Sequence, residues 1–376
     1  MPSRTIAMLC PWVPPERSAI TQYVLQAVAA LSARARVHVV WVGEEGPAVP
    51  EAERTWNQPW TSPAAALGVG ALLRQIQPDR VVLQYSPYLW SRSGFDLTGP
   101  AVTLALALAG AAPDIVWHEL WVPVTARPVG LVRGLVQRSM AALMGRLARR
   151  SIVTSRERVD ELAGVSRARE RLAFVPMSSL VPVAAVLPGE REAVRARLGV
   201  RPGELVLALF GFDHDSRPTD GLARVHAALT GAGVASRLLV IGTARVSAAD
   251  DAMRQWLLPA GFQPALEASR LLSASDLFLA PFVDGVSTRR SSIAAALAHR
   301  LPVITTSGHH TDPAVFHAGV TALAPVDDPA AFAREVVRLA RDADARDALA
   351  AAGHALFERE LSWPHHAENL WAVHAV

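Results

Sequence analysis

The sequence contains a single cysteine, no lysine and no apolar run long enough to cross a membrane. That one cysteine, Cys10, excludes a disulfide framework and a cysteine-ligated zinc site, and its place in a first strand predicts a small buried side chain. The longest apolar run covers residues 101–112, whereas a spanning helix needs roughly 20 residues. The apolar start of the chain meets Pro11 too early for a secretory signal. These absences predict a cytoplasmic protein.

An excess of charge of one sign is also missing. The 37 basic and 34 acidic residues leave a net charge of +3, which is too balanced to indicate a nucleic-acid partner. Hydrophobic residues make up 51% of the chain and charged residues 19%, so large cores are expected and disorder is not. At roughly 150 residues per domain, a chain of 376 residues predicts two or three domains.

Short apolar segments rich in valine and isoleucine alternate with longer helical patterns, which predicts parallel α/β sheets. In the first half we expect strands at 5–10, 37–42, 80–84, 115–118, 151–154 and 172–175, and helices at 21–34, 64–75 and 131–149. In the second half we expect strands at 205–211, 236–242, 277–280 and 302–305, and helices at 221–229, 266–274, 291–299, 330–341 and 345–358. The same architecture is therefore predicted twice.

A proline-rich connection between the two series places a domain boundary near Pro182–Pro188. We expect an N-terminal domain at 1–185 and a C-terminal domain at 186–360. Ligands of open α/β sheets bind outside the carboxyl ends of the strands. Two Rossmann-like domains facing across a cleft are therefore expected to carry their chemistry in the loops after the strands.

The loop after the strand at 277–280 is the most informative of these. It contains Gly285, Arg289 and Arg290 and enters a helix at Ser291 and Ser292. Free N–H groups and the helix dipole attract phosphate, and arginine binds phosphate with two parallel hydrogen bonds. The pattern therefore predicts an anion site. An ordinary serine-capped helix beside two solvated arginines is the alternative interpretation.

Three segments resemble the donor-binding region of glycosyltransferase family 4: Ser275–Pro281, the loop that follows, and Ala295–Thr306. The resemblance implies a GT-B fold, a nucleotide-diphospho-sugar donor, transfer with retention of anomeric configuration, and no metal or further cofactor. It also implies that the domain at 1–185 is the acceptor side, that the domain at 186–360 binds the nucleotide sugar, and that residues 361–376 pack back on the first domain. It is good over 273–306 and weak over the rest of the chain.

The chain departs from the family pattern at both glutamates of this region. Their places fall on Ser287 and Ala295, and the nearest carboxylate is Asp284. We therefore expect Arg289 and Arg290 to take over contacts to the diphosphate. The expected donor-binding residues of this loop are Asp284, Gly285, Ser287, Thr288, Ser291 and Ser292.

A second phosphate element is expected after the strand at 205–211. The family's Lys-Gly pair is replaced by Asp220 and Gly221, which leaves Arg217 as the cation of the loop. Arg217 is a candidate diphosphate contact, with a surface arginine as the alternative. Gly211 is expected to allow the backbone to approach the donor closely.

The N-terminal half offers candidates at three strand ends. The resemblance places Ser18 where a family loop passes under the donor, and His118 near the reacting sugar, although a core histidine is the alternative. Tyr85 and Glu119 are expected on the acceptor side. Two histidine pairs, 309–310 and 365–366, are poor metal candidates because adjacent histidines on a loop are poor paired ligands.

No acidic residue lies between Glu119 and Glu157, and this stretch holds a basic helical pattern at 131–150. Such a helix is expected either to touch an anionic lipid surface or a lipid-linked acceptor, or to be a solvated helix packed on its domain.

These observations predict a glycosyltransferase acting on a small-molecule, glycan or lipid-linked acceptor. The alternative is a degenerate, non-catalytic nucleotide-sugar-binding protein that supports a partner enzyme, because the glutamates and the lysine are missing. A nucleotide-sugar epimerase would require a carboxylate set, which the sequence does not offer. A dinucleotide dehydrogenase is disfavoured because no G-x-G-x-x-G follows a strand.

Overall fold

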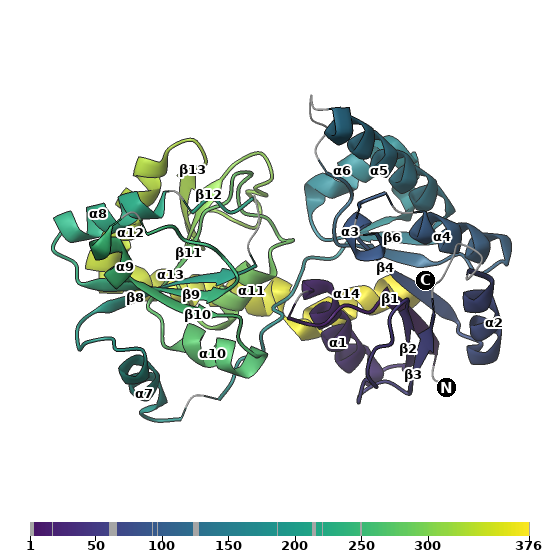
Figure 1. Ribbon diagram of the computed structural model, residues 1–376, viewed down its shortest axis with the longest axis horizontal. Helices are drawn as coiled ribbons and strands as arrows, with labels where there is room; N and C mark the ends of the chain where they lie inside the picture. Colours follow the sequence, from purple (N-terminus) through teal and green to yellow (C-terminus); the bar gives the residue numbers. More distant parts are fainter. Residues whose placement is uncertain are drawn as a thin grey trace. The chain divides into compact units, whose positions relative to one another are not determined.

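The chain divides into two compact units in the computed structural model (Figure 1). The first unit comprises Met1–Pro176 together with His366–Val376, and the second comprises Met177–His365. The structure describes residues 4–16, 18–59, 66–91, 93–95, 97–122, 128–185, 187–212, 216–219, 221–248 and 250–375.

The first unit is built on a parallel seven-stranded sheet of order β3-β2-β1-β4-β5-β6-β7. Its strands are β1 (Thr5–Pro11), β2 (Arg36–Val42), β3 (Arg54–Gln58), β4 (Arg80–Tyr85), β5 (Asp114–Trp117), β6 (Arg150–Val153) and β7 (Leu172–Phe174). Its helices are α1 (Ala19–Ser32), α2 (Ala66–Ile76), α3 (Pro87–Trp90), α4 (Thr98–Leu108), α5 (Pro128–Leu147), α6 (Arg156–Ser166) and, from His366 onward, α14 (Trp363–Ala375).

The second unit is built on a parallel six-stranded sheet of order β10-β9-β8-β11-β12-β13. Its strands are β8 (Leu205–Gly211), β9 (Ser236–Gly242), β10 (Leu257–Gly261), β11 (Leu277–Ala280), β12 (Val303–Ser307) and β13 (Ala322–Pro325). Its helices are α7 (Glu190–Arg197), α8 (Leu222–Gly231), α9 (Asp251–Trp256), α10 (Ala265–Ser273), α11 (Ser291–Ala298), α12 (Pro329–Arg341) and α13 (Ala343–Leu356).

The predicted α/β architecture is confirmed in both units. Central strands such as β1 and β11 are buried along their whole length, which is why they read as continuous apolar runs. The strands that the sequence did not reveal are β3, β10 and β13, which all lie at sheet edges. Edge strands are partly exposed and carry polar residues or proline, so their pattern resembles a loop.

The connection between the units is shorter than the proline pattern suggests. Residues 177–184 belong to the second unit because the Met177 N–H donates to the Thr288 carbonyl at 2.9 Å and the Ala184 N–H donates to Ser269 Oγ at 2.8 Å. The boundary expected near Pro182–Pro188 thus lies inside the second unit.

Both sheets contain a point where the strand order reverses. In the first unit β1 lies between β2 and β4, and in the second unit β8 lies between β9 and β11. The crevice outside the carboxyl ends of the strands at such a point is the usual ligand site of an open α/β sheet. The loops after β1 and β4, and after β8 and β11, are therefore where binding is expected.

Candidate functional site

The loop between β11 and α11 is fixed against the segment that follows β12. The Val286 N–H donates to the Thr306 carbonyl at 2.8 Å, and the His310 N–H donates to the Asp284 carbonyl at 2.9 Å. Gly285 has a φ of +89°, and a Cβ there would overlap the backbone of Gly308. The loop consequently needs glycine at this position.

Asp284 is the centre of the hydrogen bonds in this loop. Its buried carboxylate accepts from Arg289, from Arg290 at 2.8 and 2.9 Å, and from Nδ1 of His310 at 3.0 Å. Arg290 also donates to Ser216 Oγ at 2.8 Å, and this links the loop to the segment after β8. Two guanidinium groups thus share one carboxylate, so these three side chains keep one positive charge.

Burial alone would raise the pKa of Asp284, because a carboxylate loses hydration in the protein interior. The hydrogen bond from His310 and the charges of Arg290 and Arg289 outweigh this effect. Together they hold the pKa of Asp284 well below its ordinary value. Asp284 is therefore ionised at all physiological pH values and acts as the fixed counter-ion of both arginines.

Arg217 lies beside this group, and its partners are neutral. It donates to the Phe210 carbonyl at 2.6 Å and to Ser292 Oγ at 3.1 Å, and its guanidinium lies 5.4 Å from the ring centroid of Phe282. Desolvation lowers its pKa to about 10, which still leaves it protonated at neutral pH. Among the described residues no carboxylate pairs with it. A Cβ at Gly211 would lie 2.6 Å from Nη1 of Arg217, so this glycine makes room for the arginine.

Four hydroxyl side chains gather between this loop and the start of α11. Ser287 is 1% exposed, and its Oγ has no hydrogen-bond partner among the described residues. Thr288 and Ser292 are also buried, and Ser291 is the first residue of α11. The first N–H groups of an α-helix have no intrahelical partner. The arrangement therefore offers guanidinium, hydroxyl and backbone N–H donors at one helix N-terminus, which is the donor set that a phosphate group requires.

The structure brings together the candidates of the second unit: Gly211, Arg217, Asp284, Gly285, Ser287, Thr288, Arg289, Arg290, Ser291 and Ser292. Ser216 and His310 also belong to this cluster but were not predicted as site residues. Ser216 follows β8 and His310 follows β12. These positions could have identified both residues from the sequence, because the carboxyl ends of parallel strands converge at one edge of the sheet. The loop residues at 213–215 and 220, including Asp220, lie outside the described residues.

His118 lies in the first unit, directly after β5. Its Nε2 is 2.8 Å from Oε1 of Gln84, and since an amide oxygen only accepts, Nε2 carries the proton. The pKa of His118 is lowered to about 3, mainly by desolvation; the charge of Glu119 opposes this effect, and Arg158 and His366 add to it. His118 is therefore neutral at physiological pH. It can accept a hydrogen bond from a hydroxyl through Nδ1, but it cannot attract an anion by charge.

The other candidates of the first unit have structural partners. Ser18 caps α1 by accepting from the Thr21 N–H at 3.3 Å, and Glu119 forms an ion pair with Arg158. The expectation that Tyr85 lines the acceptor side is corrected: the residue is fully buried and its ring packs edge-on against a core tryptophan at 5.0 Å. Alternation along β4 turns this side chain into the sheet core.

Each histidine pair has one member that bonds to a protein group. No group of three or more histidine, cysteine, aspartate or glutamate side chains lies together in the described part of the chain. His310 bonds to Asp284, and His366 donates from Nδ1 to the Pro176 carbonyl at 2.7 Å and accepts from the hydroxyl of Tyr23 at 3.1 Å. In the same residues, no helix is both long and apolar enough to span a membrane.

Comparisons with known proteins relate the chain to sugar-transferring enzymes. Residues 219–342 match the family model for glycosyl transferases group 1. A comparison with curated proteins gives no match. HepE (Alr3699) from Anabaena, in a structure with UDP and glucose, gives a TM-score of 0.74 at 13% sequence identity and covers 99% of each chain.

Two further solved structures resemble the whole chain. Sucrose-phosphate synthase (tll1590) from Thermosynechococcus elongatus gives a TM-score of 0.72 at 16% identity, over 99% of this chain and 98% of that one. WaaG, a glycosyltransferase involved in lipopolysaccharide biosynthesis, gives a TM-score of 0.69 at 15% identity, over 98% of this chain and 99% of that one. The two-sheet architecture is therefore the GT-B fold, as the sequence resemblance implied.

Proposed function

We propose that the protein is a glycosyltransferase that moves a sugar from a nucleotide-diphospho sugar to an acceptor hydroxyl. The observation that carries this proposal is the guanidinium of Arg217, which is desolvated and bonded only to neutral groups among the described residues. A desolvated cation without a counter-charge favours an anionic ligand. The match of residues 219–342 to group 1 glycosyl transferases supports a nucleotide diphosphate as that ligand.

In this proposal the diphosphate lies at the N-terminus of α11. Arg217, the first N–H groups of α11 and the hydroxyl of Ser291 donate to its oxygens. Asp284 holds Arg289 and Arg290 in fixed positions, so that their remaining charge acts on the diphosphate without reorganisation. The same donors stabilise the charge that develops on the leaving diphosphate, which is the main catalytic contribution we assign to this unit.

The resemblance to family 4 supports transfer with retention, a reaction that needs no dedicated protein base. His118, held neutral, would accept a hydrogen bond from a sugar hydroxyl. Assignment by NMR of inverted anomeric configuration in the product would contradict retention. We propose no metal and no cofactor beyond the nucleotide sugar, because the cations at the site are side chains.

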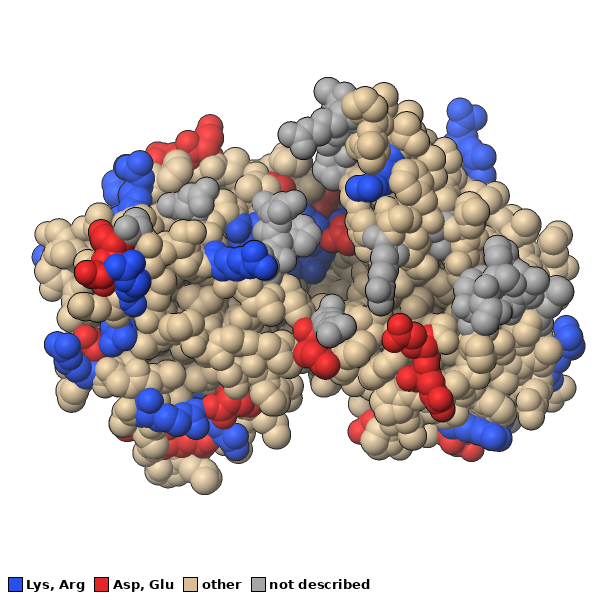
Figure 2. All heavy atoms as spheres, in the orientation of Figure 1, with Lys and Arg blue, Asp and Glu red and all other residues tan. Residues whose placement is uncertain are grey.

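We also propose that the first unit contacts an anionic membrane surface through α5. Leu131, Val132, Leu135 and Leu143 are exposed along one face of this helix, and Arg138 packs against Trp121 beside them. Figure 2 shows mainly uncharged atoms with basic side chains among them in the region where α5 and α6 lie in Figure 1. An apolar face flanked by arginines fits the surface of a bilayer with anionic lipids.

Vesicle sedimentation tests the membrane contact. The double variant Leu131→Ser, Leu135→Ser should lose binding to vesicles that contain phosphatidylglycerol. Leu266→Ser, which changes an exposed leucine of the second unit, should bind as the unchanged protein does. Equal binding of all three proteins would contradict the role of α5.

The experiment that tests the donor proposal is a thermal-shift titration with UDP, GDP and ADP. A ligand at about 100 times its dissociation constant stabilises the folded protein by roughly 2.7 kcal/mol. Arg217→Gln should abolish the shift produced by the best ligand, whereas Arg254→Gln, which removes an exposed arginine of α9, should retain it. Equal shifts in both variants would contradict the proposed site.

The alternative function is a degenerate protein that binds a nucleotide sugar without transferring it. The substitution of both family glutamates by Ser287 and Ala295 favours this alternative. A clear thermal shift with a nucleotide sugar, together with neither hydrolysis nor transfer to any acceptor, would establish it in place of the enzyme.

A further inference from the structure

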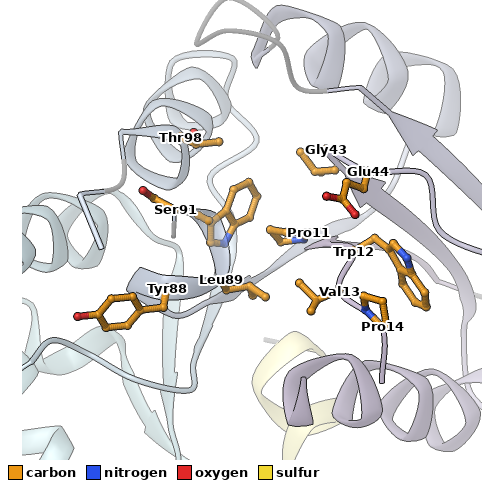
Figure 3. Close-up of a pocket in the computed structure, with 12 residues that line it drawn as sticks. Pro11, Trp12, Val13, Pro14, Gly43, Glu44, Tyr88, Leu89, Ser91 and Thr98 are labelled. Carbon is orange, nitrogen blue, oxygen red and sulfur yellow. The ribbon is translucent and has the colours of Figure 1, made fainter. Parts of the chain in front are cut away.

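A groove of about 460 Å³ lies between α8 and α12 of the second unit. It differs from the cavity of about 600 Å³ in the first unit, which lies where the chain leaves β1, β2 and β4 (Figure 3). That cavity occupies the crevice in which a ligand is already expected. None of the site residues assigned above lines the groove between the helices, so it needs an explanation of its own.

The groove is bordered by two amphipathic helices that pack against each other (Figure 1). Each helix buries one stripe of apolar side chains in the core of the unit. The buried residues are Leu222, Val225 and Leu229 on α8, and Phe332, Val336 and Leu339 on α12. Residues three or four positions apart share a helix face, so each helix turns a second stripe outward. These outward stripes form the groove.

Arginine side chains form its walls. Arg224 on α8 and Arg334, Arg338 and Arg341 on α12 line the groove, and all four are exposed. α8 contains no acidic residue, and the one acidic residue of α12, Glu335, accepts from Arg338 at 2.8 Å. Within the described ranges, no carboxylate pairs with Arg224 or Arg341. The walls therefore carry an excess of positive charge.

The ion pairs that the walls do form are weak. Arg334 donates to Asp328 at 3.2 Å, and its side chain is 68% exposed. Arg338 and Glu335 lie three positions apart on the helix, and the arginine side chain is 49% exposed. Exposed pairs of this kind contribute little to stability. A carboxylate of a bound partner can therefore replace either of them.

Small apolar side chains form the floor. Ala228, Ala330, Ala333 and Val337 line the groove between the arginines. The distance between packed helices depends on the side chains at their contact, so alanines here let another helix approach closely. The described lining includes no aromatic ring on which nucleobases would stack. A flat bilayer surface would meet the arginines and leave this floor uncovered.

We propose that the groove binds an amphipathic helix of another protein, whose apolar stripe is flanked by aspartate or glutamate. The apolar stripe lies on the floor, and the carboxylates pair with the arginines. Arg334, Arg338 and Arg341 follow one face of α12 over about 10 Å, so acidic residues spaced over two turns of the partner match them. A second copy of this chain docked through the same groove would oppose arginine with arginine.

Fluorescence anisotropy with the full chain tests this proposal with two synthetic helical peptides. Both peptides carry the same stripe of leucine and alanine, which is flanked by glutamate in one and by lysine in the other. The glutamate peptide should bind and the lysine peptide should not. Arg224→Glu, Arg341→Glu breaks no ion pair of the described residues. It should weaken binding of the glutamate peptide by about tenfold and allow the lysine peptide to bind.

The matched control is Arg201→Glu, Arg254→Glu. It changes the net charge by the same amount at two exposed positions of the second unit that do not line the groove, and it should bind the glutamate peptide as the unchanged protein does. Ala228→Phe fills the floor without changing the charge and should also weaken binding. This variant separates insertion into the groove from attraction to a positive surface. Thermal unfolding shows that each variant is folded.

Binding of neither peptide, equal binding of both, or equal affinity of the two double variants for the glutamate peptide would overturn the proposal. Two further results would overturn it by assigning the groove to another occupant. The first is loss of sedimentation with phosphatidylglycerol vesicles in Arg224→Glu, Arg341→Glu, which would indicate a lipid surface. The second is a dimer in light scattering that only this variant disrupts, which would indicate a second copy of the chain.

Discussion

Arg290 and Asp284 form an ion pair in which Nη2 of the arginine lies 2.8 Å from one carboxylate oxygen and 2.9 Å from the other. Arg289 shares the same carboxylate. The two arginines were expected to contact a diphosphate directly, and the structure shows that each already has an anionic partner. Asp284 therefore decides how much positive charge the site presents.

Asp284→Asn should destabilise the protein by about 3 kcal/mol, because it leaves two largely buried guanidinium groups without their counter-charge. Asp251→Asn breaks one exposed ion pair and should cost less than about 1 kcal/mol. Urea unfolding of both variants measures the difference. Added UDP should restore part of the stability of Asp284→Asn, since the anion replaces the lost charge.

The depressed pKa of Asp284 predicts a specific dependence of stability on acid. Its stabilising contribution is complete above the pKa of an unfolded aspartate, about 3.9, and is lost as the pH falls below that value. The difference in unfolding free energy between the unchanged protein and Asp284→Asn should thus be constant from pH 7 to about pH 5 and shrink below about pH 4. A difference in unfolding free energy that stays constant down to low pH would show that the neighbours of Asp284 do not lower its pKa.

The lowered pKa of His118 predicts that acid reduces the stability of the protein in a higher pH range than the one expected for Asp284. The pKa of His118 is lowered from an ordinary value of 6.5 to about 3. Between these two pH values the unfolded chain binds a proton at His118 and the folded protein does not. This costs stability as the pH falls below 6.5, by up to about 1.4 kcal/mol per pH unit. His118→Asn should flatten the decline of stability between pH 6.5 and 4. His317→Asn, at an exposed position, should leave the decline unchanged.

Gly285→Ala and Gly189→Ala form a matched pair. Both glycines have a positive φ, +89° and +79° respectively, but only at Gly285 would a Cβ meet other atoms, namely those of Gly308 and Thr311. Gly189→Ala should cost about 1 kcal/mol through backbone strain alone, and Gly285→Ala about 3 kcal/mol. Thermal unfolding of both variants checks that Gly285→Ala is the more destabilising substitution. Equal costs would mean that the loop moves to accommodate the methyl group.

The order of amino acids is enough to predict the fold and the place of the side chains that gather around Asp284. Buried parallel strands leave continuous apolar runs, and the loops after them begin where these runs end. The sequence pattern therefore locates Asp284, Gly285 and Ser287 through Ser292 at a strand end. Edge strands such as β3 and β13 were not found, because half-exposed residues do not produce that pattern.

What these residues do to one another depends on tertiary contacts. His310 and Ser216 join Asp284 and Arg290 from segments that are distant along the chain, and nothing local marks such a contact. The direction in which Tyr85 points, and the neutral state of His118, also depend on what packs around them. Pairing and desolvation are properties of three-dimensional surroundings, which the order of residues alone does not reveal.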